Sequence, residues 1–218
     1  CGPGALTGYL VEQLGADAVS AVDPSTSFVA AAAQRFPGID VRRAAAEALP
    51  FTDDEFDIAA AQLVVHFMTD PVAGLQEMAR VVRPGGLVAA CVWDHGGGSG
   101  PLSLFWRAVH DLNGTARDES GLPGAREGHL ATLCQAAGLR DIEASTLTVH
   151  VSFASFAAWW EPFTLGVGPA GVYVGGLDEA DREALRARCA DLVPTAPFVV
   201  DAAAWCVRAR SGPTAPSG

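Results

Sequence analysis

"CGPGALTGYL" (residues 1–10) opens the sequence with three glycines within eight residues, and apolar residues follow at helical spacing. This pattern predicts a tight turn that leads directly into a helix. Glycine suits such a turn because the missing Cβ lets a ligand lie against the backbone and because the turn can adopt a positive φ. On these ten residues alone, a ligand-binding turn and a plain turn are equally good interpretations.

The glycine spacing bears on which ligand the turn would hold. Gly2, Gly4 and Gly8 form G-x-G-x-x-x-G, whereas the dinucleotide fingerprint has its third glycine one position earlier, where this chain has Thr7. The spacing therefore weakens an interpretation as an NAD(P)-binding turn.

Downstream of the turn, helix and strand patterns alternate. The sequence predicts helices over 5–14, 24–36 and 71–82, and strands over 18–22, 39–42, 56–62 and 87–93. The strands are apolar on both faces and the helices between them are amphipathic, which indicates a parallel sheet covered on both sides.

The last third of the chain has a different character. We expect helices over 101–112, 127–137 and 178–192, and strands over 140–151 and 198–208. The segment 153–177 has neither a clean helical nor a clean strand period, and the tail 211–218 is expected to be flexible.

Composition limits the classes of function. The chain has 218 residues, a net charge of −11 and no basic cluster, so nucleic acid is a poor partner. It has no apolar run of ~20 residues, which argues against a membrane span, and no signal-peptide pattern, so we expect a cytoplasmic protein. The five cysteines are scattered without a C-x-x-C pair, which argues against zinc and other metal sites and against a disulfide framework.

Asp23 follows Gly4 by 19 residues, at the end of the second predicted strand. A carboxylate at this position can accept hydrogen bonds from the hydroxyls of a ribose. The alternative is that Asp23, which precedes Pro24 and Ser25, caps the next helix. The spacing from the glycine turn favours the binding role.

Two further stretches, AEALPFTDDEFD (46–57) and MARVVRPGGLVAACVW (78–93), complete a recognisable set with CGPG and Asp23-Pro24. In this order and spacing, the four motifs resemble the class I S-adenosylmethionine-dependent methyltransferases, and most closely the group that includes the ubiquinone and menaquinone biosynthesis enzymes. The resemblance covers residues 1–93. RPGG (83–86) is expected to be a structural turn before a strand.

The resemblance implies a Rossmann-like α/β fold, with helices on both faces of a mostly parallel seven-stranded sheet and an antiparallel last strand. The first strand, expected just before Cys1, is missing from the sequence, and its absence should leave neighbouring strand edges unpaired. We therefore predict a cofactor-binding core over 1–151 that lacks its first strand, a substrate-covering lid over 152–197, the last strand over 198–210 and a tail over 211–218.

The resemblance also implies S-adenosylmethionine as the cofactor and assigns positions to it. Gly2 and Gly4 would pass under the methionyl part and the ribose, Asp23 would bind the ribose hydroxyls, and Pro24 would pack on the adenine. Ala46 and Glu47 would contact the adenine mainly through their backbone, and Gln62 would lie beside the sulfonium. Many relatives have an aspartate where this chain has Ala45, so no side-chain hydrogen bond to the adenine amino group is expected.

Candidates for the acceptor side are less specific. His66, within one helical turn of Gln62, is a candidate general base, although a packed histidine is the favoured interpretation. His95 is a second candidate. We expect Trp159, Trp160 and Phe163 to contribute partly to an apolar acceptor pocket and partly to a core, and an aromatic wall of this kind would attract the sulfonium cation.

The sequence thus predicts a methyltransferase that transfers a methyl group in line to a small-molecule acceptor, by aligning donor and acceptor in a dry site. The sequence carries no signal for oligomeric state or for the identity of the acceptor. One alternative is an NAD(P)-dependent oxidoreductase, disfavoured by Thr7 and by a chain without any lysine. Another is a catalytically inactive methyltransferase-like binding module, which Ala45 and the missing strand leave open.

Overall fold

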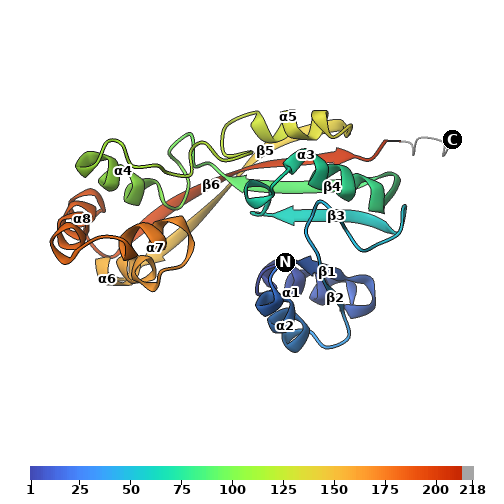
Figure 1. Ribbon diagram of the computed structural model, residues 1–218, viewed down its shortest axis with the longest axis horizontal. Coiled ribbons are helices and arrows are strands. Elements are labelled where there is room, and N and C mark those ends of the chain that lie inside the picture. The colour runs from blue at the N-terminus through green and yellow to red at the C-terminus, as the bar shows by residue number, and fades with distance from the viewer. Residues whose placement is uncertain (213–218) are drawn as a thin grey trace. The chain divides into compact units, whose positions relative to one another are not determined.

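A computed structural model describes residues 1–212 of the chain (Figure 1). Two compact units divide it: unit 1 comprises Cys1–Val92, Gly128–Ser145 and the residues from Cys206 onward, and unit 2 comprises Trp93–Glu127 and Thr146–Trp205. The helices and strands are α1 (Ala5–Leu14), β1 (Ser20–Asp23), α2 (Thr26–Arg35), β2 (Asp40–Arg43), β3 (Phe56–Gln62), α3 (Pro71–Val81), β4 (Val82–Trp93), α4 (Ser103–Leu112), α5 (His129–Ala136), β5 (Arg140–Phe153), α6 (Phe156–Trp160), α7 (Gly168–Gly175), α8 (Glu179–Leu192) and β6 (Phe198–Arg210), with short 3-10 turns at Ala16–Ala18, Val65–Phe67 and Glu161–Leu165.

The strands of the described residues form two sheets. β1 pairs in parallel with β2, and a second sheet has the order β3-β4-β6-β5, with β3 parallel to β4. β6 runs antiparallel to β5, because Glu143 contacts Arg208 while Phe153, further along β5, stacks on Phe198, earlier in β6. The predicted α/β class with an antiparallel last strand is confirmed.

Strand β3 differs from its prediction in burial. The run FDIAAAQ lies at the predicted residues, but only Ala61 is fully buried, and Ile58 is 55% exposed. Ile58, Ala60 and Gln62 project from the same face of the sheet and are all exposed, so this face is uncovered in the described residues. β3 is also an edge strand there, since it pairs with β4 on one side only. The expectation that β3 is covered on both faces is wrong for this structure.

The RPGG segment belongs to β4 and is not a turn before it. Phe56 pairs with Val82 and Ile58 with Leu87, so two steps along β3 match five steps along β4. The extra residues form a bulge, at which Gly85 adopts a φ of 76°. The segment is structural, as predicted, but it forms a bulge within β4 and not a turn before the strand.

Helix boundaries follow local capping chemistry. α3 begins as predicted, with the Asp70 carboxylate accepting a hydrogen bond from the amide of Ala73 at 3.0 Å. α2 begins two residues later than predicted, because Ser25 occupies the N-cap and accepts a hydrogen bond from the amide of Phe28. Asp23 is therefore not the cap of this helix.

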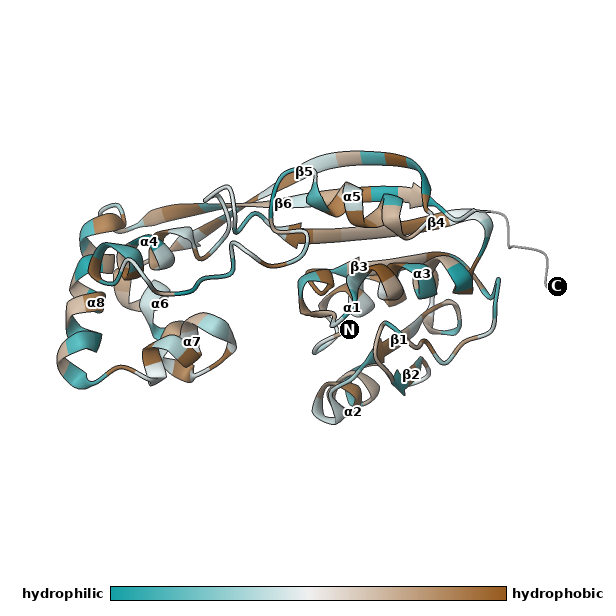
Figure 2. Cartoon of the chain, turned by 45° about the horizontal axis from the view of Figure 1, so that its top comes forward, coloured by the Kyte–Doolittle hydropathy of each residue, from teal (hydrophilic) through white to brown (hydrophobic). Residues whose placement is uncertain are grey.

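Unit 2 is built around an aromatic core. Helices α4 and α8 pack together, and Arg188 of α8 donates two hydrogen bonds to one oxygen of Asp111 of α4. Residues 153–177, predicted to lack a clean period, are mostly helical in short pieces. In the next helix, α8, Figure 2 shows hydrophilic residues along its length. Residues 93–127 fall in the same unit as 146–205. The division into a core, a lid and a last strand stays a prediction.

The predicted strand over 140–151 extends to Phe153, but its side chains are exposed on both faces except for the half-buried Ile142 and Phe153.

The segment predicted to be a flexible tail begins with a residue that is held by hydrogen bonds. Ser211 is buried, its amide donates to Gly86 O at 3.0 Å, and its hydroxyl donates to Arg83 O at 2.6 Å. The rest of the predicted tail from residue 213 lies outside the described residues. No helix in the described part of the chain is long and apolar enough to cross a membrane.

Candidate cofactor-binding site

The carboxylate of Asp23 lies at the carboxyl end of β1 and contacts the glycine turn. Its Oδ2 accepts hydrogen bonds from the backbone nitrogens of Gly2 at 2.8 Å and Cys1 at 3.0 Å, and its Oδ1 accepts one from the amide of Ser25 at 2.8 Å. A carboxylate offers about four acceptor positions. Among the described residues three are used, so one position on Oδ1 remains for a ligand hydroxyl.

Asp23 is ionised over the whole physiological range. The residue is only 8% exposed, and burial by itself raises the pKa of its carboxyl group. The hydrogen bonds from the amides of Gly2 and Ser25, together with the hydrogen bond and charge of the amino group of Cys1, act in the opposite direction and prevail, so the pKa lies below its ordinary value. A buried, charged acceptor at this point is suited to neutral hydroxyl donors.

The surroundings of the three glycines in the turn differ, and so does the reason for a glycine at each position. Gly2 has a φ of 55°, and a Cβ built on it would meet nothing within 4 Å, so the space in front of it is open. A Cβ on Gly4 or on Gly8 would lie 2.5 Å or 2.7 Å from the ring of Phe36. Gly4 and Gly8 are therefore needed for the packing of α1 against the end of α2. Of the three, only Gly2 presents an open backbone face, and a cofactor role for Gly4 stays a prediction.

The two residues predicted to contact adenine make internal contacts. Oε1 of Glu47 accepts hydrogen bonds from the amides of Thr69 at 2.7 Å and Asp70 at 3.2 Å, just before α3. The Cβ of Ala46 lies 3.4 Å from a Cβ built on Gly74. Ala46 and Glu47 are half-buried in a turn, and Pro24 is exposed beside Asp23. A role in binding the adenine stays a prediction for all three residues.

The carboxyl end of β3 carries a strained residue that the sequence did not reveal. Gln62 is exposed, and the following Leu63 has a φ of 58°, an unusual value for a residue with a branched side chain. The amide of Leu63 donates to Cys91 O at 2.9 Å, which extends the pairing with β4. Backbone strain of this kind gathers at functional sites.

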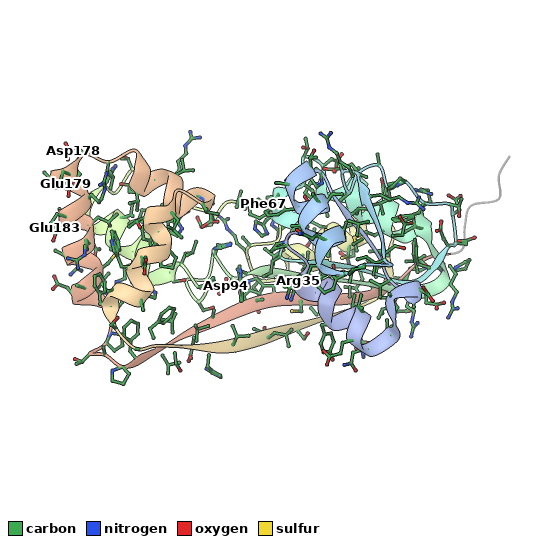
Figure 3. The ribbon with its side chains drawn as sticks, turned by 90° about the horizontal axis from the view of Figure 1, so that it is seen from below. Arg35, Phe67, Asp94, Asp178, Glu179 and Glu183 are labelled. Carbon is green, nitrogen blue, oxygen red and sulfur yellow. The ribbon has the colours of Figure 1, made fainter. Side chains whose placement is uncertain are left out.

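His66 lies in the short 3-10 turn after β3, where it is buried with 6% exposure. Its ring centroid is 3.9 Å from that of Phe67, whose side chain is 64% exposed (Figure 3). This packing agrees with the favoured interpretation of His66 as a packed residue. A catalytic role for His66 stays a prediction.

The second candidate base, His95, belongs to a buried polar cluster within unit 2. Its Nδ1 lies 4.0 Å from Oε2 of Glu119, which also accepts a hydrogen bond from Nε1 of Trp106 at 2.9 Å. Burial lowers the pKa of His95, and the opposing effect of Glu119, Asp118 and Asp94 is smaller. His95 is therefore neutral at pH 7 and able to accept a proton.

Trp159, Trp160 and Phe163 come together, but in the packed core of unit 2. Their exposures are 3%, 6% and 8%, and the ring of Phe163 lies 4.7 Å from that of Phe105. Their packing favours the core role over a pocket wall. The aromatic hydrophobicity of the segment was visible in the sequence, but its packing partner α4 was not.

Unit 1 also has a groove of about 420 Å³, and neither Gly2 nor Asp23 lines it. Its charged lining comes from the starts of β3, β4 and β5 and the end of β6, and it includes Asp57, Arg83, Asp141, Glu143, Arg208 and Arg210. Ligands of parallel α/β sheets bind at the carboxyl ends of the strands, whereas this groove lies at the amino ends of β3 and β4. Asp23 and Gly2 remain the better candidate site.

The fold and this site define a class: a Rossmann-like α/β domain with a glycine turn and an acidic residue at the carboxyl end of the next strand. Residues 1–90 match the family described as "Methyltransferase domain". A solved structure of a putative methyltransferase from Bacillus halodurans has a TM-score of 0.55 and 15% identity, over 89% of this chain and 83% of that one. This likeness supports the fold.

Curated relatives carry methyltransferase names. A demethylmenaquinone methyltransferase from Mycobacterium sp. (strain KMS) is 42% identical over 73 residues, which are 33% of this chain and 30% of the relative. A malonyl-[acyl-carrier protein] O-methyltransferase from Pseudescherichia vulneris is 37% identical over 115 residues, which are 50% of this chain and 42% of the relative. The matched segments thus span less than half of either relative. Residues 1–90 are thus similar to a methyltransferase domain, and these comparisons support a class I S-adenosylmethionine-dependent methyltransferase.

Proposed function

We propose that this protein is an S-adenosylmethionine-dependent methyltransferase that acts on a small-molecule acceptor. The observation that carries the proposal is the buried, ionised Asp23, which is bound to the amide of Gly2 and has one acceptor position left over. The methyltransferase names of these two curated relatives support the reaction. The demethylmenaquinone in the first name supports a small acceptor, whereas the malonyl group in the second is carried on a protein.

The residues present fit the cofactor. Oδ1 of Asp23 can accept a hydrogen bond from one ribose hydroxyl, and the open face of Gly2 lets the ligand lie against the turn. Bound S-adenosylmethionine supplies an electrophilic methyl group on a sulfonium with a neutral leaving group. The protein's task is then to hold donor and acceptor in line, a positioning effect of up to ~7–11 kcal/mol.

Proton removal from the acceptor requires a neutral base. His66, which belongs to the same unit as Asp23, is the first candidate. His95 is the second candidate, and burial lowers its pKa. Neither the NAD(P)-dependent oxidoreductase nor the inactive binding module finds support among the relatives described above.

Replacement of Asp23 tests the proposal. Loss of a charge-assisted hydrogen bond costs ~1.5–3 kcal/mol, so Asp23→Ala should weaken the binding of S-adenosylhomocysteine roughly 10- to 100-fold in isothermal titration. Asp94→Ala is a matched control, because Asp94 is also a buried carboxylate that accepts three hydrogen bonds, from Gly97, Ser99 and Trp205. The control should lose stability but keep its affinity within about threefold.

Two results would contradict the proposal. The first is a wild-type protein that does not bind S-adenosylhomocysteine, and the second is an Asp23→Ala variant with normal affinity and a lowered melting temperature. If binding is found, a search for products heavier by one methyl group, in small-molecule extracts supplied with labelled cofactor, identifies the acceptor.

A further inference from the structure

The glycine turn is flanked by a cation that no motif indicated. Arg35 is the last residue of α2, from which its side chain projects (Figure 3). Nη1 of Arg35 donates a hydrogen bond to the carbonyl oxygen of Pro3 at 3.3 Å, and its Cζ lies 5.1 Å from the centroid of the Phe36 ring. Two contacts therefore hold the guanidinium at the middle of the Gly2-Pro3-Gly4 turn.

The charge of Arg35 is not neutralised by a neighbour. Several arginines of unit 1 form ion pairs: Arg42 with Asp40, Arg80 with Glu77 and Asp53, Arg83 with Asp57, and Arg208 with Glu143. Within residues 1–212, no carboxylate lies within 4.0 Å of Arg35, although acidic residues outnumber basic ones by 25 to 14 in the sequence. Its guanidinium is available to an anionic group.

Stabilisation of α2 by the charge of Arg35 explains only part of the contacts that this residue makes. A cation in the last turn interacts favourably with the helix dipole, by about 0.3–1 kcal/mol. That role needs only proximity to the carbonyl groups that end α2. It does not account for the contact with Pro3, which lies 32 residues away in the turn.

The turn consequently has opposite charges at its two sides. Asp23 contacts the amide of Gly2, Arg35 contacts the carbonyl of Pro3, and the backbone between these two atoms spans at most ~7 Å. A ligand that lies along the turn should offer hydroxyl groups to Asp23 and an anionic group to Arg35. The ribose and the amino-acid carboxylate of S-adenosylmethionine stand in this relation.

We propose that Arg35 binds the carboxylate of the methionyl end of the cofactor, an inference that rests on the proposed function. Guanidinium and carboxylate form strong, charge-assisted hydrogen bonds, often two at once. Arg35 thereby selects a cofactor that carries its amino-acid tail over a nucleoside that lacks it.

The test compares two ligands that differ in this tail. S-adenosylhomocysteine has the amino-acid carboxylate, whereas 5′-methylthioadenosine lacks it. Isothermal titration of Arg35→Gln should show S-adenosylhomocysteine binding weakened about 10-fold and 5′-methylthioadenosine binding changed less than threefold. Arg35→Lys, which keeps the charge but not the planar fork, should lie between Arg35→Gln and the wild type.

Arg43→Gln is the matched control. Arg43 also donates to a proline carbonyl beside the site, Pro24 O at 3.2 Å, but on the other side of Asp23. It should leave the ratio of the two affinities unchanged, since both ligands have the same adenosine part. A melting temperature for each variant shows that it is folded.

The outcomes separate the two proposals. Wild-type protein that binds neither ligand overturns the proposed function and this inference with it. Wild-type protein that binds both ligands, together with an Arg35→Gln variant in which both affinities fall equally or neither falls, overturns the assignment of Arg35 alone.

Discussion

At the scale of single residues, two aspartates in this chain show how one chemical group serves two purposes. Asp23 and Asp94 are both buried, and each accepts three hydrogen bonds from protein donors. The donors of Asp94 include a serine hydroxyl and a tryptophan ring, and they close a loop of unit 2. Asp23 has only backbone donors and an acceptor position left for a ligand, which is why the cofactor proposal rests on it.

His95 makes the stability of the protein depend on pH. Its folded-state pKa is lowered by burial, against Glu119, Asp118 and Asp94, while in the unfolded chain it takes up a proton near pH ~6.5. The unfolded state therefore binds more protons as the pH falls below ~6.5, and the free energy of unfolding decreases, by at most ~1.4 kcal/mol per pH unit. Lowered carboxyl pKa values such as that of Asp23 act only below pH ~4.

Urea unfolding at pH 7.5, 6.5 and 5.5, followed by tryptophan fluorescence, measures this dependence. His95→Gln should flatten the decline, and His150→Gln, a substitution at an exposed histidine, is the control for the loss of one imidazole. An unchanged decline in His95→Gln would show that other groups cause it.

At the scale of elements, the bulge in β4 sets the register of the sheet. A Cβ on Gly86 would lie 2.8 Å from Asp57 O and 2.9 Å from Arg83 O, and these backbone atoms cannot move away without breaking the strand pairing. Gly85 has a positive φ but open space around it, so it demands glycine only for its backbone conformation.

One substitution at each position should therefore show the difference between the two glycines. Gly86→Ala should destabilise the protein by about 1–3 kcal/mol or more through overpacking. Gly85→Asn should cost less, because asparagine tolerates the left-handed region. Chemical denaturation of both variants measures the difference, and equal costs would mean that the bulge adapts freely to a side chain at position 86.

At the scale of the whole molecule, the chain forms two units with cores of their own. The core of unit 2 brings residues from α4, α6, α8 and β6 together, among them Phe105, Trp159, Leu185 and Phe198. Trp159 is 3% exposed within it. Truncation of such a residue removes its buried surface and leaves a cavity.

Trp159→Ala should cost ~3–5 kcal/mol of stability. Native-state hydrogen exchange should show the lost protection in residues 93–127 and 146–205, which form unit 2. The alternative, that the tryptophan is a wall of the acceptor pocket, requires normal stability with a raised acceptor KM. That result would restore the pocket that the sequence predicts for this segment.

The sequence by itself determined the features that depend on local chemistry. Asp70 and Pro71 start a helix, apolar runs of strand length form strands, and the spacing from Gly4 to Asp23 indicates a nucleoside site, because each depends on residues close together in the chain. Only the tertiary structure decided that Phe36 requires Gly4 and Gly8, that Arg35 reaches Pro3, that β3 is an edge strand and that Trp159 is core. Each of these depends on which distant segments pack together, and no periodicity or spacing in the chain records that choice.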